Sequence, residues 1–588
     1  MSADFVQEPP ELHNQYERDR VLQSYVRRQF PDAIRSAIEP ELADLGDMAA
    51  NELYDLQQSD LDNEPTLTRW GAWGDRVDEI ELTDVWKRAE TLAAERGVVA
   101  TAYDQEHGAH SRVHQMLLAY LFIPSTDMYG CPLAMTDGAA RALLDSGNEA
   151  LIEEAVPHLT SRDPDSFWTS GQWMTELSGG SDVTRARTTA RQDDDGTWRL
   201  HGRKWFTSAI TANVALALAR PEEASTSDDL ALFYVPVRDE NGLSEGIRVN
   251  RLKDKLGTRK LPTAELTLDG AAARPVTDDL ANGTRHIAPM LNVTRTWNAV
   301  TSTALIRRGL ALARDYAQKR TAFGDEIINH PLHQETLADV QATLEGSFHL
   351  SFRLAELLGA RETGAADDTQ RALLRILTPM AKLTTAKQAV AATSELLEAF
   401  GGAGYVEDTG LPALHRDAQV LPIWEGTTNV LALDLLRALR SVGSIAPLNE
   451  EVKRCVEDIE APTLTKAVRP AVHAYRDAAK WLKRALDEGD EALQAGARRF
   501  ALTLGHSLQL LYTARHAQWS LHAAQDGRSA AAAERLAARQ VNHIADLDHH
   551  GAYVLVWDFN CPTLFDCHAQ GDGAAGEEPS LESLTDVM

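Results

Sequence analysis

The sequence predicts a mostly α-helical protein with a central β domain. Before about residue 165 and again after residue 287, apolar residues recur at three- and four-residue spacing, which is typical of amphipathic helices. The segment between them consists of short stretches of β-forming residues separated by Asp, Gly, Asn and Ser. The order lacks βαβ alternation, and no G-x-G-x-x-G motif follows a predicted strand into a helix, so a Rossmann-type nucleotide domain is not expected.

The N-terminal helical domain is expected to cover residues 1–165. Its predicted helices are 16–30, 34–56, 82–96, 111–121, 138–144 and 148–156, with Pro157 ending the last one. We expect Trp70, Trp73 and Trp86 to be core or lid aromatics rather than binding residues.

The middle β domain is expected at 166–278. Its predicted strands are 197–200, 214–219, 230–237, 247–249 and 263–268, and the Asp-rich turn at 193–196 reads as a hairpin tip. A helical bundle domain is predicted at 279–440, with helices at 298–318, 337–362, 368–397 and 430–439. An additional helical domain follows at 441–568, with helices at 474–486 and 495–518, and the acidic, Gly-rich stretch 569–588 is expected to be disordered.

The composition describes an acidic globular protein. With 87 acidic and 58 basic residues among 588, the formal charge is −29, which favours an acidic surface and disfavours general binding to nucleic acid or anionic membrane. The four cysteines are scattered, the N-terminus lacks the features of a signal peptide, and no apolar run approaches about 18 residues. We therefore expect a cytoplasmic protein that does not enter a membrane.

One carboxylate stands out at residues 421–430, Leu-Pro-Ile-Trp-Glu-Gly-Thr-Thr-Asn-Val. Glu425 lies between Trp424 and Gly426, directly before an apolar helical stretch. A carboxylate beside an aromatic ring and flexible backbone is suited to remove a proton from carbon. The alternative is a surface acid near a helix N-terminus, where the helix dipole favours negative charge.

Two further stretches, 173–183 and 200–209, have the composition of a cofactor site. Thr175 offers a hydroxyl and a backbone N–H, and Gly179-Gly180-Ser181 lets the backbone approach a phosphate or a ring edge. The second stretch places two aromatics and two hydroxyls on a strand. Each stretch alone is equally compatible with an ordinary turn.

Five motifs in order give a specific resemblance. They are M-T-E-x-x-x-G-S-D at 174–182, G-x-K-W-F-T-S at 202–208, R-x-x-F-G at 320–324, G-G-x-G-Y at 401–405 and W-E-G-T at 424–427. Together they resemble the acyl-CoA dehydrogenase family of flavoproteins, over roughly residues 117–439. The resemblance implies a helical domain, a β-barrel-like middle domain and a four-helix bundle, in a homotetramer that holds FAD noncovalently.

The resemblance also assigns site residues. Thr175 would bond the flavin pyrimidine edge, Thr207 would lie near flavin N5, and Arg320 and Phe323 would reach the FAD of a neighbouring subunit. The implied FAD contacts are Trp173, Met174, Thr175, Gly180, Ser181, Trp205, Phe206, Thr207, Arg320, Phe323, Gly401, Gly402, Trp424, Thr427 and Asn429. The implied substrate contacts are Ser181, Arg295, Trp424 and Gly426.

Glu425 matches the catalytic base of the family. It would remove the α-proton of an acyl-CoA while the β-hydrogen leaves as hydride to flavin N5, giving a 2-enoyl thioester. An electron-transfer flavoprotein is the implied acceptor. Trp424 stands where the family commonly has Tyr, and its larger ring would narrow the acyl pocket.

Several details point to the AidB-like, alkylation-response branch. They are the Gly-Gly-Ser loop, the paired Arg307-Arg308, Ile423-Trp424-Glu425-Gly426 and the extra helical domain after residue 439. That resemblance offers an alternative function, a DNA-associated flavoprotein with weak or no acyl-CoA turnover. Residues 441–588 carry 14 basic and 21 acidic side chains, a net charge of −7, which disfavours DNA binding.

A cluster of potential metal ligands occurs near the C-terminus. His543, His549 and His550 precede Cys561, Cys567 and His568, but their spacing fits no standard zinc pattern. We therefore expect no metal site there.

Overall fold

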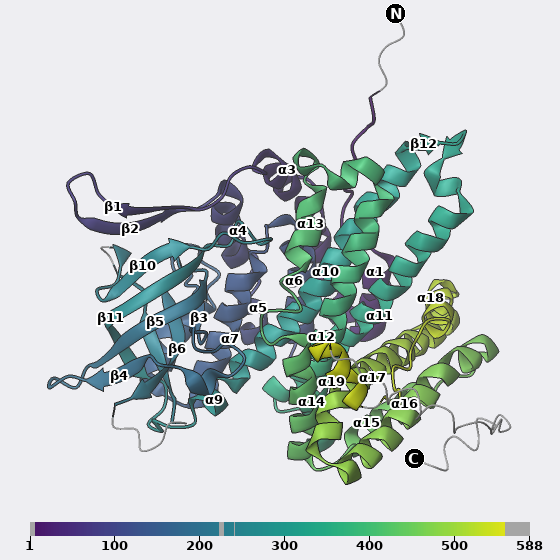
Figure 1. Cartoon of the computed structure of the whole chain (residues 1–588). Coiled ribbons are helices and arrows are strands. Elements are labelled where there is room, and N and C mark those ends of the chain that lie inside the picture. Colours follow the sequence, from purple (N-terminus) through teal and green to yellow (C-terminus); the bar gives the residue numbers. More distant parts are fainter. Residues whose placement is uncertain (1–5, 223–228, 240–241, 548, 559–588) are drawn as a thin grey trace, which may run out of the picture. The chain divides into compact units, whose positions relative to one another are not determined.

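The computed structural model describes residues 6–222, 229–239, 242–547 and 549–558, and the chain divides into two compact units. The first unit comprises residues 1–374 and 381–430, and the second comprises 375–380 and 431–588. The predicted class, helical with a central β domain, is confirmed (Figure 1). The domain boundaries after residues 165, 278 and 440 stay predictions.

Helices dominate the first 160 residues. They are α1 (Arg20–Gln29), α2 (Asp32–Ala50), α3 (Glu52–Ser59), α4 (Asp84–Glu95), α5 (Ala100–Asp104), α6 (His110–Phe122), η1 (Ile123–Ser125), α7 (Gly130–Ser146) and α8 (Glu149–Leu159). The predicted single helix over 34–56 is wrong, because the backbone breaks at Asn51 between α2 and α3. Pro157 does not end α8, since the Thr160 N–H bonds to Val156 O and closes a further turn.

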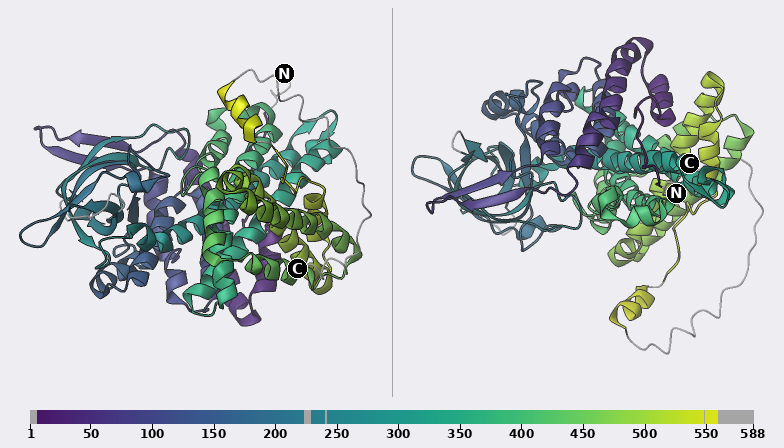
Figure 2. Two further views of the ribbon diagram at one scale, coloured as in Figure 1. Left: turned by 60° about the horizontal axis from the view of Figure 1, so that its bottom comes forward. Right: turned by 90° about the horizontal axis from the view of Figure 1, so that it is seen from above.

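A β-hairpin that the sequence did not predict interrupts these helices. Strands β1 (Thr66–Trp70) and β2 (Arg76–Glu81) form it, and it lies along β10 of the β domain (Figure 2). Trp70 and Trp73 are 57% and 98% exposed, so of the two predicted positions, core or lid, the core is wrong for both: Trp70 ends β1 and Trp73 lies in the turn after it. Trp86 is buried as predicted and donates its indole N–H to Asp127 O.

The β domain closes into a barrel. Its strands are β3 (Ser170–Trp173), β4 (Thr189–Gln192), β5 (Trp198–Ser208), β6 (Val214–Pro221), β7 (Ala231–Pro236), β8 (Arg238–Asp239), β9 (Gly242–Leu243), β10 (Ile247–Leu252) and β11 (Thr263–Pro275), with a short η2 turn (Val183–Arg185). β7 pairs with both β6 and β11, which closes a ring through β5 and β4. Inward side chains such as Phe233, Val235 and Leu266 fill it.

Two predictions about the barrel were tested directly. The turn at 193–196 is a hairpin tip as predicted, closed by the Asp193 N–H bonding to Thr197 O at 2.8 Å. The last strand is longer than predicted, because a bulge at Asp269–Ala271 turns β11 and lets it continue to Pro275.

Helices also make up most of residues 283–442. They are α9 (Gly283–His286), α10 (Ala288–Lys319), α11 (Pro331–Glu362), α12 (Asp368–Ala399), α13 (Leu411–Ala418) and α14 (Thr428–Val442), with the hairpin β12 (Thr321–Ala322) and β13 (Asp325–Glu326) and the short turns η3 (Ile327–Asn329), η4 (Gly401–Tyr405) and η5 (Glu407–Thr409). A capping box of Asp367 and Gln370 starts α12. The long helices predicted for the bundle are confirmed; parts of α12 and α14 belong to the second unit.

The second unit is helical throughout its described part. Its elements are α15 (Ala446–Val456), α16 (Pro462–Glu488), α17 (Asp490–Trp519), the π-turn η6 (Ser520–Ala524), α18 (Arg528–Ala537) and α19 (His549–Trp557). Trp481 of α16 packs on Phe500 and over Gly496 of α17. The predicted disordered stretch 569–588 lies outside the described residues. Within the described chain, every helix is too short or too polar to cross a membrane.

Candidate active site

Glu425 lies in the tight turn between α13 and α14. Its backbone is left-handed, with φ of 56°, and Gly426 follows with φ of 102°. A left-handed conformation costs a non-Gly residue about 1–2 kcal/mol, so it persists only where surrounding contacts hold it. The Glu425 side chain is partly buried and hydrogen-bonded, so it is not a freely solvated surface acid.

Three consecutive carbonyls of this turn accept hydrogen bonds from cationic side chains. Lys382 of α12 donates to Trp424 O at 2.6 Å and to Gly426 O at 2.7 Å. Arg295 of α10 donates through Nε to Glu425 O at 3.3 Å. The carboxylate itself is held by Thr294, whose Oγ1 donates to Glu425 Oε2 at 2.7 Å. The turn is therefore anchored from two helices.

The charge of Glu425 affects the pKa of two buried groups, Lys382 and Cys131. Burial lowers the pKa of Lys382 to about 7, and the Glu425 charge opposes that shift. Burial raises the pKa of the Cys131 thiol to about 12, and Glu425 adds to the rise. Burial also lowers the pKa of Lys255, which interacts with Cys131, to about 8. Lys255 Nζ donates to Thr263 Oγ1 of β11, so this chain of interactions runs from the base to the β domain.

The predicted flavin strand, β5, ends beside Thr263, which pairs with Ser208. The Trp205 N–H bonds to Thr175 O at 2.9 Å, which joins the two predicted cofactor stretches. Lys253 Nζ lies 3.6 Å from the centroid of the Trp205 ring and covers one of its faces. Phe206 is 49% exposed, whereas Thr207 is buried and donates its hydroxyl to Ala264 O.

Glu176 and Lys204 form a buried pair beneath this strand that sequence reasoning missed. Lys204 Nζ donates to Glu176 Oε1 at 2.8 Å, and Glu176 also accepts from the backbone of Arg187 and Thr188. The pair thus ties the loop after Thr175 to β5. Thr294 and Lys382 were also missed; Thr294 stands beside the predicted Arg295, but Lys382 had no signal beyond being a lysine in an apolar helix.

The remaining predicted FAD residues form a second group far from Glu425. Phe323 is fully exposed at the tip of the β12–β13 hairpin beside Arg320, and Gly401 and Gly402 are exposed after α12. Tyr316 and Phe400 have ring centroids 5.3 Å apart, so both motifs lie at the same end of the bundle. Because a helix rises about 1.5 Å per residue, Arg320 lies about 37 Å along α10 from Arg295. The structure therefore divides the predicted cofactor residues between two locations.

The other predicted residues belong to the stretches 173–181 and 424–429. Trp173 is buried, Met174, Thr175 and Trp424 are partly buried, and the exposed members are Gly180, Ser181, Thr427 and Asn429. The Trp173 Nε1 and the neighbouring Gln172 Oε1 are buried without a hydrogen-bond partner among the described residues. Such orphaned polar atoms are expected where a ligand supplies the missing partner.

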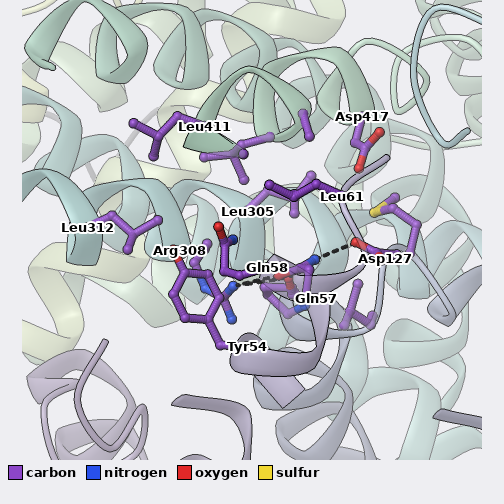
Figure 3. Close-up of a pocket in the computed structure, with 16 residues that line it drawn as sticks. Tyr54, Gln57, Gln58, Leu61, Asp127, Leu305, Arg308, Leu312, Leu411 and Asp417 are labelled. Carbon is purple, nitrogen blue, oxygen red and sulfur yellow. Dashed lines mark hydrogen bonds between the residues drawn. The ribbon is translucent and has the colours of Figure 1, made fainter. Parts of the chain in front are cut away.

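A cavity of about 60 Å³ lies between α3, η1, α10 and α13 (Figure 3). Its lining residues are Tyr54, Gln57, Gln58, Leu61, Ile123, Pro124, Asp127, Met128, Leu305, Arg308, Leu312, Gly410, Leu411, Ala413, Leu414 and Asp417. Arg308 is buried, packs on the Tyr54 ring and donates to Pro124 O. Burial lowers the pKa of Arg308 to about 9 and raises that of Asp417 to about 7.

Within the described part of the chain, no three His, Cys, Asp or Glu side chains group as metal ligands. His543 bonds instead to His506, with 2.9 Å between their ring nitrogens. Cys561, Cys567 and His568 lie outside the described residues.

Three family descriptions match successive segments of the chain. Residues 7–166 match "Adaptive response protein AidB N-terminal domain", 171–271 match "Acyl-CoA dehydrogenase, middle domain", and 281–440 match "Acyl-CoA dehydrogenase, C-terminal domain". Acyl-CoA dehydrogenase family member 11 of Caenorhabditis elegans is 42% identical over 86% of this chain and 84% of its own length. The chain is an AidB-like acyl-CoA dehydrogenase.

Other relatives agree with this assignment. The putative acyl-CoA dehydrogenase AidB of Escherichia coli is 32% identical to the AidB-like chain, over 66% of it and 72% of AidB. The crystal structure of C. elegans ACDH-11 in complex with C11-CoA superposes with a TM-score of 0.89 at 38% identity, covering 95% of this chain and 97% of that one. The fold predicted from the motifs is thus confirmed. The AidB-like enzyme is an oxidoreductase, and FAD is the cofactor of its family.

Proposed function

We propose that this enzyme oxidises an acyl-CoA between its α and β carbons, with Glu425 as the base. The observation that carries the proposal is the anchored turn of Glu425, whose carboxylate is held by Thr294 while Lys382 and Arg295 hold its backbone. A base held in one geometry acts at a high effective concentration on a bound α-proton. Trp424, beside it, would limit how the acyl chain enters.

FAD, when bound, accepts the β-hydrogen as hydride. The residues present fit this cofactor: Gln172 has a buried Oε1 without a partner among the described residues, Phe206 is exposed, and the neighbouring Trp205 N–H bonds to Thr175 O. Met174, Gly180 and Ser181 stand near Thr175 in sequence, Thr427 and Asn429 stand near Glu425, and together they complete the proposed set. The Thr207 hydroxyl already donates its hydrogen bond to Ala264 O, so toward the flavin it can act only as a hydrogen-bond acceptor.

The separation of the FAD residues supports a homo-oligomer, with a tetramer as the proposed state. Arg320, Phe323, Gly401 and Gly402 lie about 37 Å along the bundle from Arg295 by helix rise, too far to serve the same bound cofactor. If this end of the bundle in one chain contacts the FAD site of a second chain, and the reverse contact forms as well, each chain completes the other's cofactor site. The exposed Phe323, at the hairpin tip, is then a contact with the FAD of a neighbouring subunit.

A long-chain acyl-CoA is the proposed substrate. C. elegans ACDH-11 was solved with C11-CoA, and the cavity offers room for the end of such a chain. Thr294, Asn298, Leu305, Arg308 and Leu312 follow one face of α10 at three-, four- and seven-residue spacing. Leu305, where the cavity begins, lies about 16 Å along the helix from Thr294. An acyl chain running beside this face would bring its far end to the cavity.

Anaerobic titration of the purified holoenzyme with a panel of acyl-CoAs tests the proposal. We expect undecanoyl-CoA to bleach the flavin absorbance, and Glu425→Gln to retain FAD and lose the bleaching. Bleaching that survives Glu425→Gln would remove Glu425 from its role. An electron-transfer flavoprotein is the proposed acceptor, and its reduction by the substrate-treated enzyme is the matching assay.

A further inference from the structure

Lys382 occupies an unusual position for a lysine. Its side chain is fully buried in α12, and it forms no ion pair within 4 Å among the described residues. Its two hydrogen-bond acceptors are the carbonyls of Trp424 and Gly426, on either side of Glu425. Burying an ammonium group without a paired carboxylate is unfavourable, and an apolar side chain of similar volume would fill the space without that penalty.

The two contacts of Lys382 span the residue that carries the base. A single Nζ that bonds the carbonyls before and after Glu425 fixes the direction of both adjoining peptide planes. Those planes determine where the Glu425 side chain leaves the backbone, and the left-handed φ of 56° is the conformation they impose. Arg295 fixes the middle carbonyl from the opposite helix.

We infer that Lys382 is a positioning residue for the reaction, which holds the turn of Glu425 so that its carboxylate meets the α-proton. This inference rests on the proposed role of Glu425 as the base. Lys382 does not touch the reacting atoms; it acts through the backbone on either side of the base. Burial of the amine, with a smaller contribution from Arg295, lowers the pKa of Lys382 to about 7, and the charge of Glu425 opposes that shift. The amine retains protons to donate in either charge state.

A positioning role and a purely structural role of Lys382 have different effects on the kinetics of flavin reduction. If Lys382 only supports the fold, its loss lowers stability, FAD content and thioester affinity together. If it positions the base, its loss slows flavin reduction while thioester affinity stays nearly unchanged. The split between the reduction rate and the dissociation constant therefore separates the two roles.

The test compares Lys382→Met, Lys382→Gln and the control Lys387→Met, which lies five residues further along the same helix and is only partly buried. Stopped-flow reduction of each holoenzyme by undecanoyl-CoA gives the rate and the dissociation constant. We expect Lys382→Met to lower the rate about 100-fold, the effect of a misplacement near 1 Å, and Lys387→Met to leave it unchanged. Lys382→Gln, which keeps a donor, should lose about tenfold, as expected for one bond of about 1.4 kcal/mol.

Chemical rescue provides a readout that a structural defect would not give. Lys382→Ala lacks the atoms of one n-propylammonium ion. Added n-propylamine should therefore raise the flavin-reduction rate of this variant by at least about tenfold. Lys382→Gln serves as the kinetic variant if Lys382→Met loses FAD. Full wild-type rate in both Lys382 variants, equal loss of rate and affinity, or no rescue by n-propylamine would each overturn the inference.

The same series keeps this inference distinct from the proposed function. Reduction that survives Glu425→Gln defeats the proposed base and, with it, the role of Lys382. Reduction that is lost in Glu425→Gln and intact in Lys382→Met defeats only the role of Lys382. If both Glu425→Gln and Lys382→Met lose flavin reduction, thioester affinity is kept and n-propylamine rescues Lys382→Ala, then both the proposed base and the role of Lys382 are supported.

Discussion

Thr294 Oγ1 donates a hydrogen bond of 2.7 Å to Glu425 Oε2, and the two residues come from α10 and from the turn before α14. The bond fixes the end of the side chain, whereas Lys382 and Arg295 fix the backbone from which it starts. Glu425 is thus constrained at both ends before any substrate binds. Each constraint can be removed by one substitution.

Thr294→Val should slow flavin reduction by about tenfold, because a hydrogen bond to a charged group contributes about 1.5–3 kcal/mol. Valine keeps the branched shape in the helix but cannot donate to Glu425. Stopped-flow reduction measures the change, and Thr294→Ser should recover most of it. Thr296→Val is the matched control, because the Thr296 hydroxyl bonds to Asn292 O within α10 and has no bond to Glu425. Equal slowing in both variants would contradict an orienting role for Thr294.

Filling the cavity should change the selection of chain length. Leu305 is buried at the start of the cavity, and Leu305→Phe adds volume there without adding charge. We expect the dissociation constant of undecanoyl-CoA to rise about tenfold, while that of butyryl-CoA stays the same, since a misfit of this size costs about 1–3 kcal/mol. Binding is followed by the flavin spectrum of the holoenzyme. A uniform loss for both thioesters would show that the chain does not reach the cavity.

The sequence motifs predicted the residues that carry the chemistry better than the residues that hold them in position. Glu425 and Arg295 stand in short, recognisable stretches, and the structure brings them together. Lys382 lies 43 residues before Glu425 in the middle of α12, and only the packing of that helix brings its amine to the turn. Such long-range contacts leave no local pattern in a single sequence.

The same limit explains the errors in the fold. The long helices follow from periodicity, whereas the β1–β2 hairpin, with its exposed Trp73, is short and rests on the edge strand β10. Tryptophans among helical segments favour a core or lid position, because these large aromatic side chains are highly buried on average. Nothing in residues 66–81 alone shows that a barrel strand lies beside them.

Asp417→Asn should stabilise the protein at neutral and alkaline pH. Burial raises the folded-state pKa of Asp417 from 3.8 to about 7, so the folded state holds a proton that the unfolded state has lost between those values. Stability from this group is therefore highest below pH 4 and falls as pH rises toward 7. Asparagine stays neutral and still accepts from the Thr258 N–H. We expect a gain of up to about 4 kcal/mol at pH 8 and none near pH 4, since the pKa rises by about three units and each unit is worth about 1.4 kcal/mol.

Chemical denaturation of the variant and the wild type at pH 4.5, 6 and 8 measures that gain. The difference should grow with pH and level off above pH 7. A constant difference across this range would show that Asp417 is ionised throughout.

Duplex DNA should not bind at physiological salt. Residues 441–588 carry a net charge of −7, and their described arginines include Arg454, Arg484 and Arg515, which pair with Glu451, Asp546 and Asp458. Nonspecific binding depends on unpaired cations that release counterions from phosphate. Fluorescence anisotropy of a labelled duplex should show no rise at 150 mM salt. A saturable rise that weakens steeply with salt would revive the DNA-associated function.

Arg112 should be the most costly single charge to remove from the first unit. It is 1% exposed, bonds to Asp137 and to both oxygens of Glu362, and Asp137 also accepts from Trp297 and Tyr103. Arg112→Met leaves two buried carboxyls without their cation, and breaking a buried pair in this way costs about 3–5 kcal/mol. Urea unfolding at pH 7 measures the loss.

Arg361→Met is the control for this network. Arg361 precedes Glu362 on α11 and pairs at 3.4 Å with Asp145, with both side chains partly exposed, so its loss should cost less than about 1 kcal/mol. Lowering the pH should reduce the deficit of Arg112→Met, because protonation removes the unpaired charge of Glu362. Burial already raises the pKa of Glu362, which brings that protonation closer to neutral pH. A deficit that is equal at pH 5 and pH 8 would mean that lost packing, rather than unpaired charge, destabilises the variant.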